Sequence, residues 1–217
     1  MPDHDPIREE LQSRYRAYRP VLQRHLNDAL ALASPAVIRE ATREIGLIPS
    51  DPFNPESALY LVYDLVVFGE KPGQARAIDR YARKARPAGE GLEAETLAAL
   101  RQSRFHILQA VRRHDHAGTI ARDHLRKQEV WLLDEGLESS WKIGTFLATR
   151  LVALGGFSTT AGVFIPVDED VLADAMASRP SWRKEPHQIL PDDPQLPQAV
   201  YAAAIAHGQL RNVDYRD

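Results

Sequence analysis

The hydrophobic pattern of this 217-residue chain changes its period near residue 104. Before that point apolar residues recur every three to four positions, as in the stripe Val37, Ile38, Ala41 and Ile45, and this spacing is typical of amphipathic helices. After it, short apolar runs alternate with glycine-containing turns at a spacing of about 8–12 residues, which is typical of strands. A chain with both periods in separate blocks is predicted to adopt an α+β fold.

We expect a helical N-terminal half packed on a small, mostly antiparallel β-sheet or barrel, with short helices at the C-terminal end. The predicted regions are residues 1–103 (helical), 104–167 (the β module) and 168–217 (helices with a proline-rich segment). The first and last regions are expected to share one continuous domain. The strand signal is weakest at Thr145–Leu154, where helical propensity competes.

Two helical segments carry specific expectations. Proline restarts the apolar pattern at Pro20, so the first helix is expected to end near Tyr18 and a second to begin there. The segment Glu56–Phe68 is apolar on nearly every face, which predicts a helix buried at the centre of the helical half. A further expectation is a turn at Glu135-Gly136.

Asp64 lies inside that apolar helix and is the most interesting single carboxylate. Burial raises the pKa of a carboxyl group, and catalytic acids have this property. A buried aspartate more often accepts hydrogen bonds in a structural network, and Tyr60, Tyr63 or Arg80 are the expected donors.

Composition excludes several classes of function. The chain has no cysteine, which excludes disulfides, thiolate nucleophiles and thiolate metal sites. Its formal net charge of −3 gives no bulk attraction to nucleic acid or anionic lipid. No apolar run reaches about 20 residues, and no basic start precedes an apolar stretch, so we expect no membrane association and no secretory signal. A cytoplasmic location is expected by elimination.

Three segments resemble a known group of proteins. They read ALYLVYDLVVFGE at 58–70, ARDHLRKQEVWLLDEG at 121–136 and ATRLVALGGF at 148–157. In this order, over about Ser57 to Val167, the chain resembles uncharacterised bacterial proteins in which a helical part precedes a small β-barrel, related to SEC-C motif-containing proteins. The cysteine-rich zinc motif of those relatives is absent here, so the resemblance implies no zinc site and supplies no catalytic residues.

The densest group of potential metal ligands consists of His114, His116, Asp123 and His124. Imidazole and carboxylate groups suit zinc and other first-row metals, and the two arms of a hairpin could bring them together. The same residue types are common in ordinary exposed turns, and their spacing matches no recognised metal motif. The expected cofactor is therefore none, with a metal-dependent hydrolase at these four residues as an alternative.

The strand region is locally basic, with nine Lys or Arg against six Asp or Glu between residues 101 and 150. The candidate binding residues are Arg112, Arg113, Arg122, Arg126, Trp131 and Trp141. Small barrels bind single-stranded nucleic acid through basic grooves with stacking aromatic residues, so this class is a second alternative. Arginines on the outer face of a sheet also simply keep it soluble.

The sequence shows no activated nucleophile and no cofactor loop at the spacing that its chemistry would require. The glycine-rich run at 155–162 lacks the lysine of a phosphate-binding loop and precedes a strand pattern instead of a helix. We therefore expect a non-catalytic cytoplasmic binding protein whose partner is another protein.

Overall fold

The computed structural model describes residues 5–47, 57–85, 90–179, 182 and 190–212. Five helices come first: α1 (Pro6–Leu30), α2 (Pro35–Glu44), α3 (Ser57–Phe68), α4 (Ala77–Ala85) and α5 (Leu92–Gln102). The strands follow as β1 (Arg104–Arg113), β2 (Thr119–Asp123), β3 (Gln128–Leu132), β4 (Phe146–Leu154) and β5 (Phe157–Val167), with the short helix α6 (Glu135–Ser140) between β3 and β4. The chain continues with α7 (Glu169–Ala177) and α8 (Leu196–Ala206), and has 3-10 turns at Leu190–Asp192 and Gln209–Asn212. The α+β prediction is confirmed, and the change of period coincides with the start of β1.

The five strands form one mixed sheet that closes in the order β1-β2-β3-β5-β4, with β4 returning to β1. Four of the strand pairs are antiparallel, and β3 pairs with β5 in parallel through a single register position, Leu132 with Ser158. The uncertain segment Thr145–Leu154 does form a strand, β4, which pairs with both β1 and β5.

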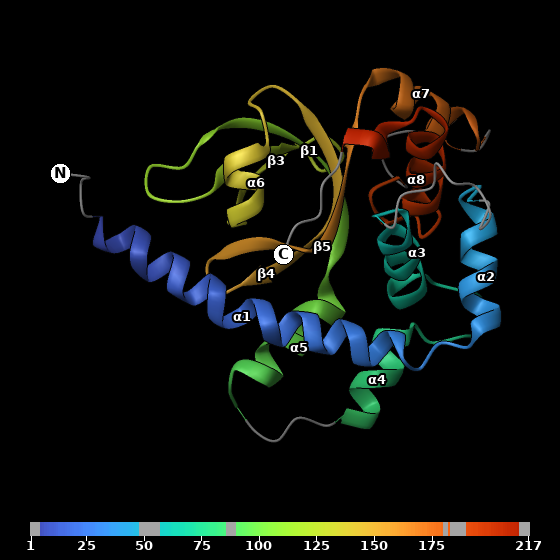
Figure 1. The fold of residues 1–217 in the computed structure, drawn as a ribbon, viewed down its shortest axis with the longest axis horizontal. Coiled ribbons are helices and arrows are strands. Elements are labelled where there is room, and N and C mark those ends of the chain that lie inside the picture. Colours follow the sequence, from blue (N-terminus) through green and yellow to red (C-terminus); the bar gives the residue numbers. More distant parts are fainter. Residues whose placement is uncertain (1–4, 48–56, 86–89, 180–181, 183–189, 213–217) are drawn as a thin grey trace.

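Side chains of β1 alternate between the inside and the outside of the closed sheet, as the pleat requires. Leu108 and Ala110 belong to the inner cluster, together with Trp141 and Leu137 of α6. Phe105 and Ile107 belong to an outer cluster that includes side chains of α2, α3, α7 and α8. Those four helices gather on one side of the sheet (Figure 1).

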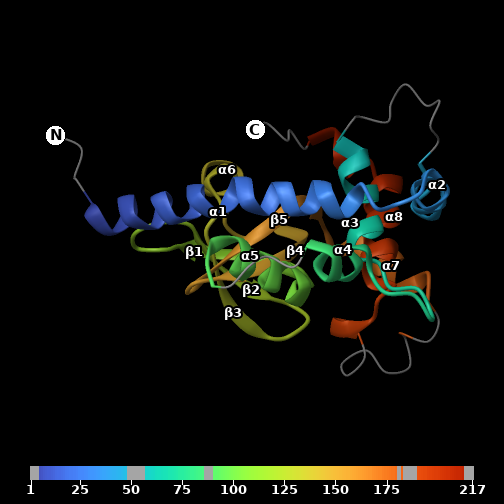
Figure 2. The ribbon, with the colours of Figure 1, turned by 90° about the horizontal axis from the view of Figure 1, so that it is seen from below.

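Helix α1 runs along the length of the molecule beside α4 and α5 (Figure 2). Asp5 caps its N-terminus by accepting from the backbone N–H groups of Ile7 and Arg8. The predicted break at Pro20 is wrong, because the helix continues through Pro20 to Leu30. Its buried face stays continuous across the proline, and this tertiary packing outweighs the loss of one backbone donor.

The expectation that the apolar helix is buried on most faces is confirmed for α3, in which Leu59 and Tyr60 are the exposed residues. One other expectation needs correction. The predicted turn at Glu135-Gly136 is the first turn of α6, whose N-cap Asp134 accepts from the N–H of Leu137. A helix of this length with a glycine in its first turn gives almost no periodic signal. Of the proline-rich segment, residues 180–181 and 183–189 lie outside the described residues.

Candidate functional site

The histidines of the β1–β2 turn point to different partners. His114 stacks on the ring of Trp131 at a centroid distance of 4.1 Å. His116 donates from Nδ1 to Asp5 Oδ2 over 3.0 Å, which connects this turn to the start of α1. The same hydrogen bond holds the pKa of Asp5 below its ordinary value.

The other two residues of the predicted metal group are also engaged separately. His124 Nε2 lies 3.3 Å from Gln109 Oε1, and Asp123 faces His106 instead. The structure does not bring the four predicted ligands together. In the described part of the chain, no group of three or more histidine, aspartate or glutamate side chains is placed to hold a metal ion.

The two tryptophans among the predicted binding residues, Trp131 and Trp141, lie in separate clusters. Trp141 is buried among the inner residues of the closed sheet. Trp131 is half-buried on the side facing α1, donates from Nε1 to the carbonyl of Ala117, and contacts Phe157 edge-on at 6.2 Å. Trp131 and Trp141 therefore do not form a pair of exposed rings beside the arginines.

The four predicted arginines also separate. Arg113 donates to Thr119 Oγ1 and to the carbonyl of Trp141, so it joins β1 to β2 and to the end of α6. Arg112 and Arg122 are exposed on β1 and β2. Only Arg126, in the turn between β2 and β3, reaches toward the helices that cover the sheet.

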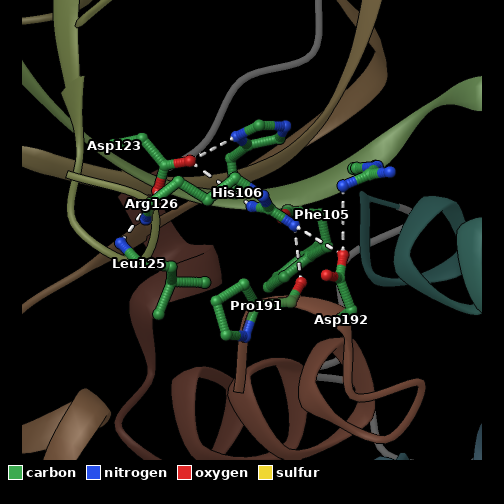
Figure 3. Close-up of polar contacts among 8 residues, drawn as sticks. Phe105, His106, Asp123, Leu125, Arg126, Pro191 and Asp192 are labelled. Atoms are coloured by element: carbon green, nitrogen blue, oxygen red, sulfur yellow. Dashed lines mark hydrogen bonds and ion pairs between the residues drawn. The ribbon is translucent and has the colours of Figure 1, made fainter. Parts of the chain in front are cut away.

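Arg126 belongs to a polar cluster around Asp123 (Figure 3). Asp123 Oδ1 accepts from the backbone N–H groups of Leu125 and Arg126, and its Oδ2 accepts from His106 Nδ1 over 2.8 Å. Burial raises the pKa of Asp123, but the hydrogen bonds from these donors lower it by more. The pKa of Asp123 therefore lies below its usual value. His106 was not singled out in the sequence, where its only signal is a polar residue at an inward position of a strand.

On the far side of this cluster, Arg126 extends toward the C-terminal helices. Its Nη2 donates to the carbonyl of Pro191 over 2.6 Å and to Asp192 Oδ1 over 3.3 Å. Figure 3 shows this contact between Arg126 and Asp192. Arg104, at the start of β1, donates to the same Asp192 oxygen over 3.4 Å. Two guanidinium groups therefore meet at one carboxylate oxygen, although the Asp192 side chain is 71% exposed.

A second polar network lies between α3, β4 and α8. Arg150 donates from Nε and Nη2 to the two oxygens of Asp64 over 2.9 and 3.2 Å, and Tyr201 donates its hydroxyl to Asp64 Oδ2. The guanidinium lies 4.4 Å above the ring of Phe68. The prediction of a buried Asp64 network is confirmed, but these donors differ from the expected ones, and Arg80 donates to the carbonyl of Ala75 instead.

Between these two networks is a cleft of about 680 Å³, which we call the arginine cleft. Four arginines line it, each from a different part of the chain: Arg76 before α4, Arg101 on α5, Arg104 on β1 and Arg150 on β4. Carboxylates also line it, namely Glu70, Asp192 and Asp193, beside apolar side chains that include Leu65, Phe68 and Phe105.

The arginines of the cleft are held in place by the chain itself. Arg76 and Arg101 both donate to Asp79, over 2.7 and 3.0 Å, and Arg76 also donates to the carbonyl of Arg101. Partial burial opposes ionisation of Asp79, but the two guanidiniums keep its pKa below the ordinary value. Arg76 and Arg101, like Arg150, are therefore oriented by carboxylates of the chain before any ligand arrives.

Ser103 also lines the cleft, directly before β1. Its hydroxyl is buried and has no hydrogen-bond partner among the described residues. Buried polar groups normally have hydrogen-bond partners, so this hydroxyl is a candidate donor to a ligand of the cleft.

A larger hollow of about 810 Å³, which we call the tyrosine groove, lies between α1, α3, α6 and β5. Tyr15, Tyr60 and Tyr63 line it, together with Asp64. Burial, reinforced by nearby carboxylate charge, raises the pKa of Tyr15 to about 12. Phe68 lines both the groove and the arginine cleft.

No helix among the described residues combines the length and apolar character needed to span a bilayer. Neither the curated proteins nor the solved structures contain a match to the chain. A family model, described as a family of unknown function (DUF7986), matches residues 9–184. This match carries no information on the SEC-C resemblance. Since it covers most of the sequence, the chain belongs to the DUF7986 family.

Proposed function

We propose that the protein is a non-catalytic cytoplasmic binding protein that recognises an acidic segment of another protein through the arginine cleft. One observation carries this proposal. Arg104 and Arg126 already converge on a carboxylate oxygen of an exposed side chain, Asp192, at the edge of the cleft. This contact is a local example of the recognition that we propose for a partner's carboxylates.

The fixed geometry of the cleft supports binding. Guanidinium groups recognise carboxylates through directed, charge-assisted hydrogen bonds, and less affinity is lost when their positions are set in advance. Arg150 and Arg76 meet this condition because carboxylates of the same chain orient both. Of the carboxylates in the lining, Asp193 already accepts from Trp182 Nε1 and the backbone N–H of Gln195. The contacts of Asp192 are long and exposed, so a partner could displace it.

The position of the buried pair Asp123 and His106 supports a role without catalysis. A histidine oriented by an aspartate resembles the base of a hydrolase, but such a base must reach its substrate. His106 is not among the residues that line the cleft, and its Nδ1 is engaged with Asp123 at the end of the closed sheet. The pair is better explained as a structural link between β1 and the β2–β3 turn.

The proposal is tested by titrating hexaglutamate into the protein and measuring binding by isothermal titration calorimetry at low and high salt. A net charge of −3 gives no general attraction for this peptide, so binding requires a local cationic site. We expect binding that weakens with salt, and that Arg104→Ala reduces about threefold to fivefold, as for an exposed ion pair.

Arg122→Ala is the matched control, since Arg122 is an exposed strand arginine outside the cleft. It should leave the affinity unchanged. Absence of hexaglutamate binding at low salt would contradict the proposal. So would tighter binding of a single-stranded oligonucleotide that Arg122→Ala weakens, because that result would favour the basic strand face.

A further inference from the structure

We propose that the part of the arginine cleft beside Ser103 is a subsite for a phosphate group carried by the bound segment, that is, for a phosphorylated side chain. This inference rests on the proposed function and specifies the chemistry of the ligand. Its basis is the position of an unpaired donor, the Ser103 hydroxyl, next to fixed guanidinium groups.

The Ser103 hydroxyl is a donor without an acceptor. The side chain is 6% exposed, and its Oγ has no hydrogen-bond partner in the described part of the chain. Leaving a buried hydroxyl unpaired is unfavourable, and replacement by alanine would remove the cost. A ligand oxygen in the cleft would satisfy this donor.

The Ser103 hydroxyl and the guanidinium of Arg150 belong to residues that line the same cleft, next to the paired residues Phe105 and Arg150 of the sheet. Phe105 is paired with Arg150 across the β1–β4 ladder, so both side chains leave the same face. Ser103 is the C-cap residue of α5, with φ −59° and ψ 143°, and directly precedes β1. Both Ser103 and Arg150 line the cleft.

A phosphate fits these donors better than a carboxylate does. A phosphorylated side chain carries a charge of about −1.5 to −2 and has three acceptor oxygens, which can meet donors from different directions. The cleft offers a hydroxyl at Ser103, a buried guanidinium at Arg150 and an exposed one at Arg104. A carboxylate has two oxygens in one plane and a charge of −1, so it offers fewer directions of approach and less charge to the same donors.

The existing contacts of Arg150 limit the contribution that its charge can make to binding a ligand. Its contacts with Asp64 and with the ring of Phe68 hold the guanidinium in place. Asp64 balances its charge, so the doubly charged phosphate would draw mainly on Arg104, which is 63% exposed, with Asp192 as its competing acceptor. In this subsite, Arg150 would orient the phosphate and Arg104 would supply most of the opposing charge.

The test uses three peptides, Glu-Glu-X-Glu-Glu, in which X is serine, glutamate or phosphoserine, together with inorganic phosphate as a separate probe. Binding to the full chain is measured by calorimetry for wild type, Ser103→Ala and Thr159→Val. Thr159 is the matched control because its hydroxyl is also buried and unpaired but does not line the cleft. Thermal unfolding of each unliganded variant shows whether the fold is retained.

We expect the phosphoserine peptide to bind about tenfold more tightly than the glutamate peptide, as one added charge-assisted hydrogen bond implies. Ser103→Ala should remove most of this preference and leave the glutamate peptide unaffected. Thr159→Val should change neither affinity. A merely structural serine would give a variant with altered thermal stability and an unchanged preference.

Equal affinity for the phosphoserine and glutamate peptides would overturn the phosphate subsite while leaving the acidic-segment proposal in place. Failure of all three peptides would refute both. Inorganic phosphate that binds as tightly as the phosphopeptide would overturn the assignment of the phosphate to a protein segment. A preference that survives in Ser103→Ala would exclude the hydroxyl as its source.

Discussion

Replacing Asp64 by asparagine should destabilise the fold far more than any change to a surface ion pair. The carboxylate is 4% exposed and accepts two hydrogen bonds from Arg150 and one from Tyr201. Asparagine keeps the shape and one acceptor oxygen but removes the charge. The guanidinium of Arg150 would then remain buried without a counter-ion.

The expected loss follows from the cost of an uncompensated charge. Removing one member of a buried ion pair typically lowers the free energy of unfolding by about 3–5 kcal/mol. Because the asparagine oxygen still accepts one hydrogen bond, we expect the lower end, about 3 kcal/mol. The double variant Asp64→Leu/Arg150→Met removes both charges at similar volume and should lose less than about 1.5 kcal/mol.

Urea unfolding followed by circular dichroism measures these values, with Arg16→Met as the control. Arg16 pairs with Glu135 at the surface, where its side chain is 66% exposed, so that change should cost less than about 1 kcal/mol. The reasoning fails if Asp64→Asn costs as little as the control. It also fails if the double variant loses as much as Asp64→Asn, since the loss would then come from packing.

Two other changes have defined outcomes. Asp123→Asn should lower the free energy of unfolding by about 2 kcal/mol at pH 7, through loss of the charged hydrogen bond from His106. Because the folded pKa of Asp123 lies below 3.8, its contribution is present above that pH and is lost as the pH falls through the folded pKa, so urea titrations of wild type and variant should converge at low pH. Asp192→Asn should increase hexaglutamate affinity about twofold to threefold in calorimetry, because it removes an exposed competitor for Arg104 and Arg126, and reduced affinity would show that Asp192 assists binding.

The fold could be predicted from the sequence where local pattern decides the structure. The change of period before Arg104 marks the first strand, and the weak strand signal at Thr145–Leu154 is resolved by pairing with two neighbours. Pro20 misled the prediction, because propensity describes an isolated helix and the buried face of α1 continues across it. The local sequence pattern predicted which segments form helices and strands, and tertiary packing determined where a helix such as α1 ends.

The candidate site was much less accessible to sequence reasoning. An aspartate in an apolar helix predicted a buried network at Asp64, but its donors Arg150 and Tyr201 are 86 and 137 residues away. No spacing rule connects such positions. Arg150 had one usable signal, a charge within the apolar segment ATRLVAL. Ser103 had none, because an unpaired hydroxyl is recognised only from its surroundings.

The arginine cleft and the tyrosine groove share a wall. Asp64 faces the groove, its bonded partner Arg150 faces the cleft, and Phe68 contributes to both. Any occupant that displaces this wall from one side alters the shape available on the other. If two occupants do so, each changes the affinity of the other by the same factor, because such coupling is reciprocal. The arginine cleft and the tyrosine groove are thus neighbouring cavities separated by the side chains of Asp64, Arg150 and Phe68.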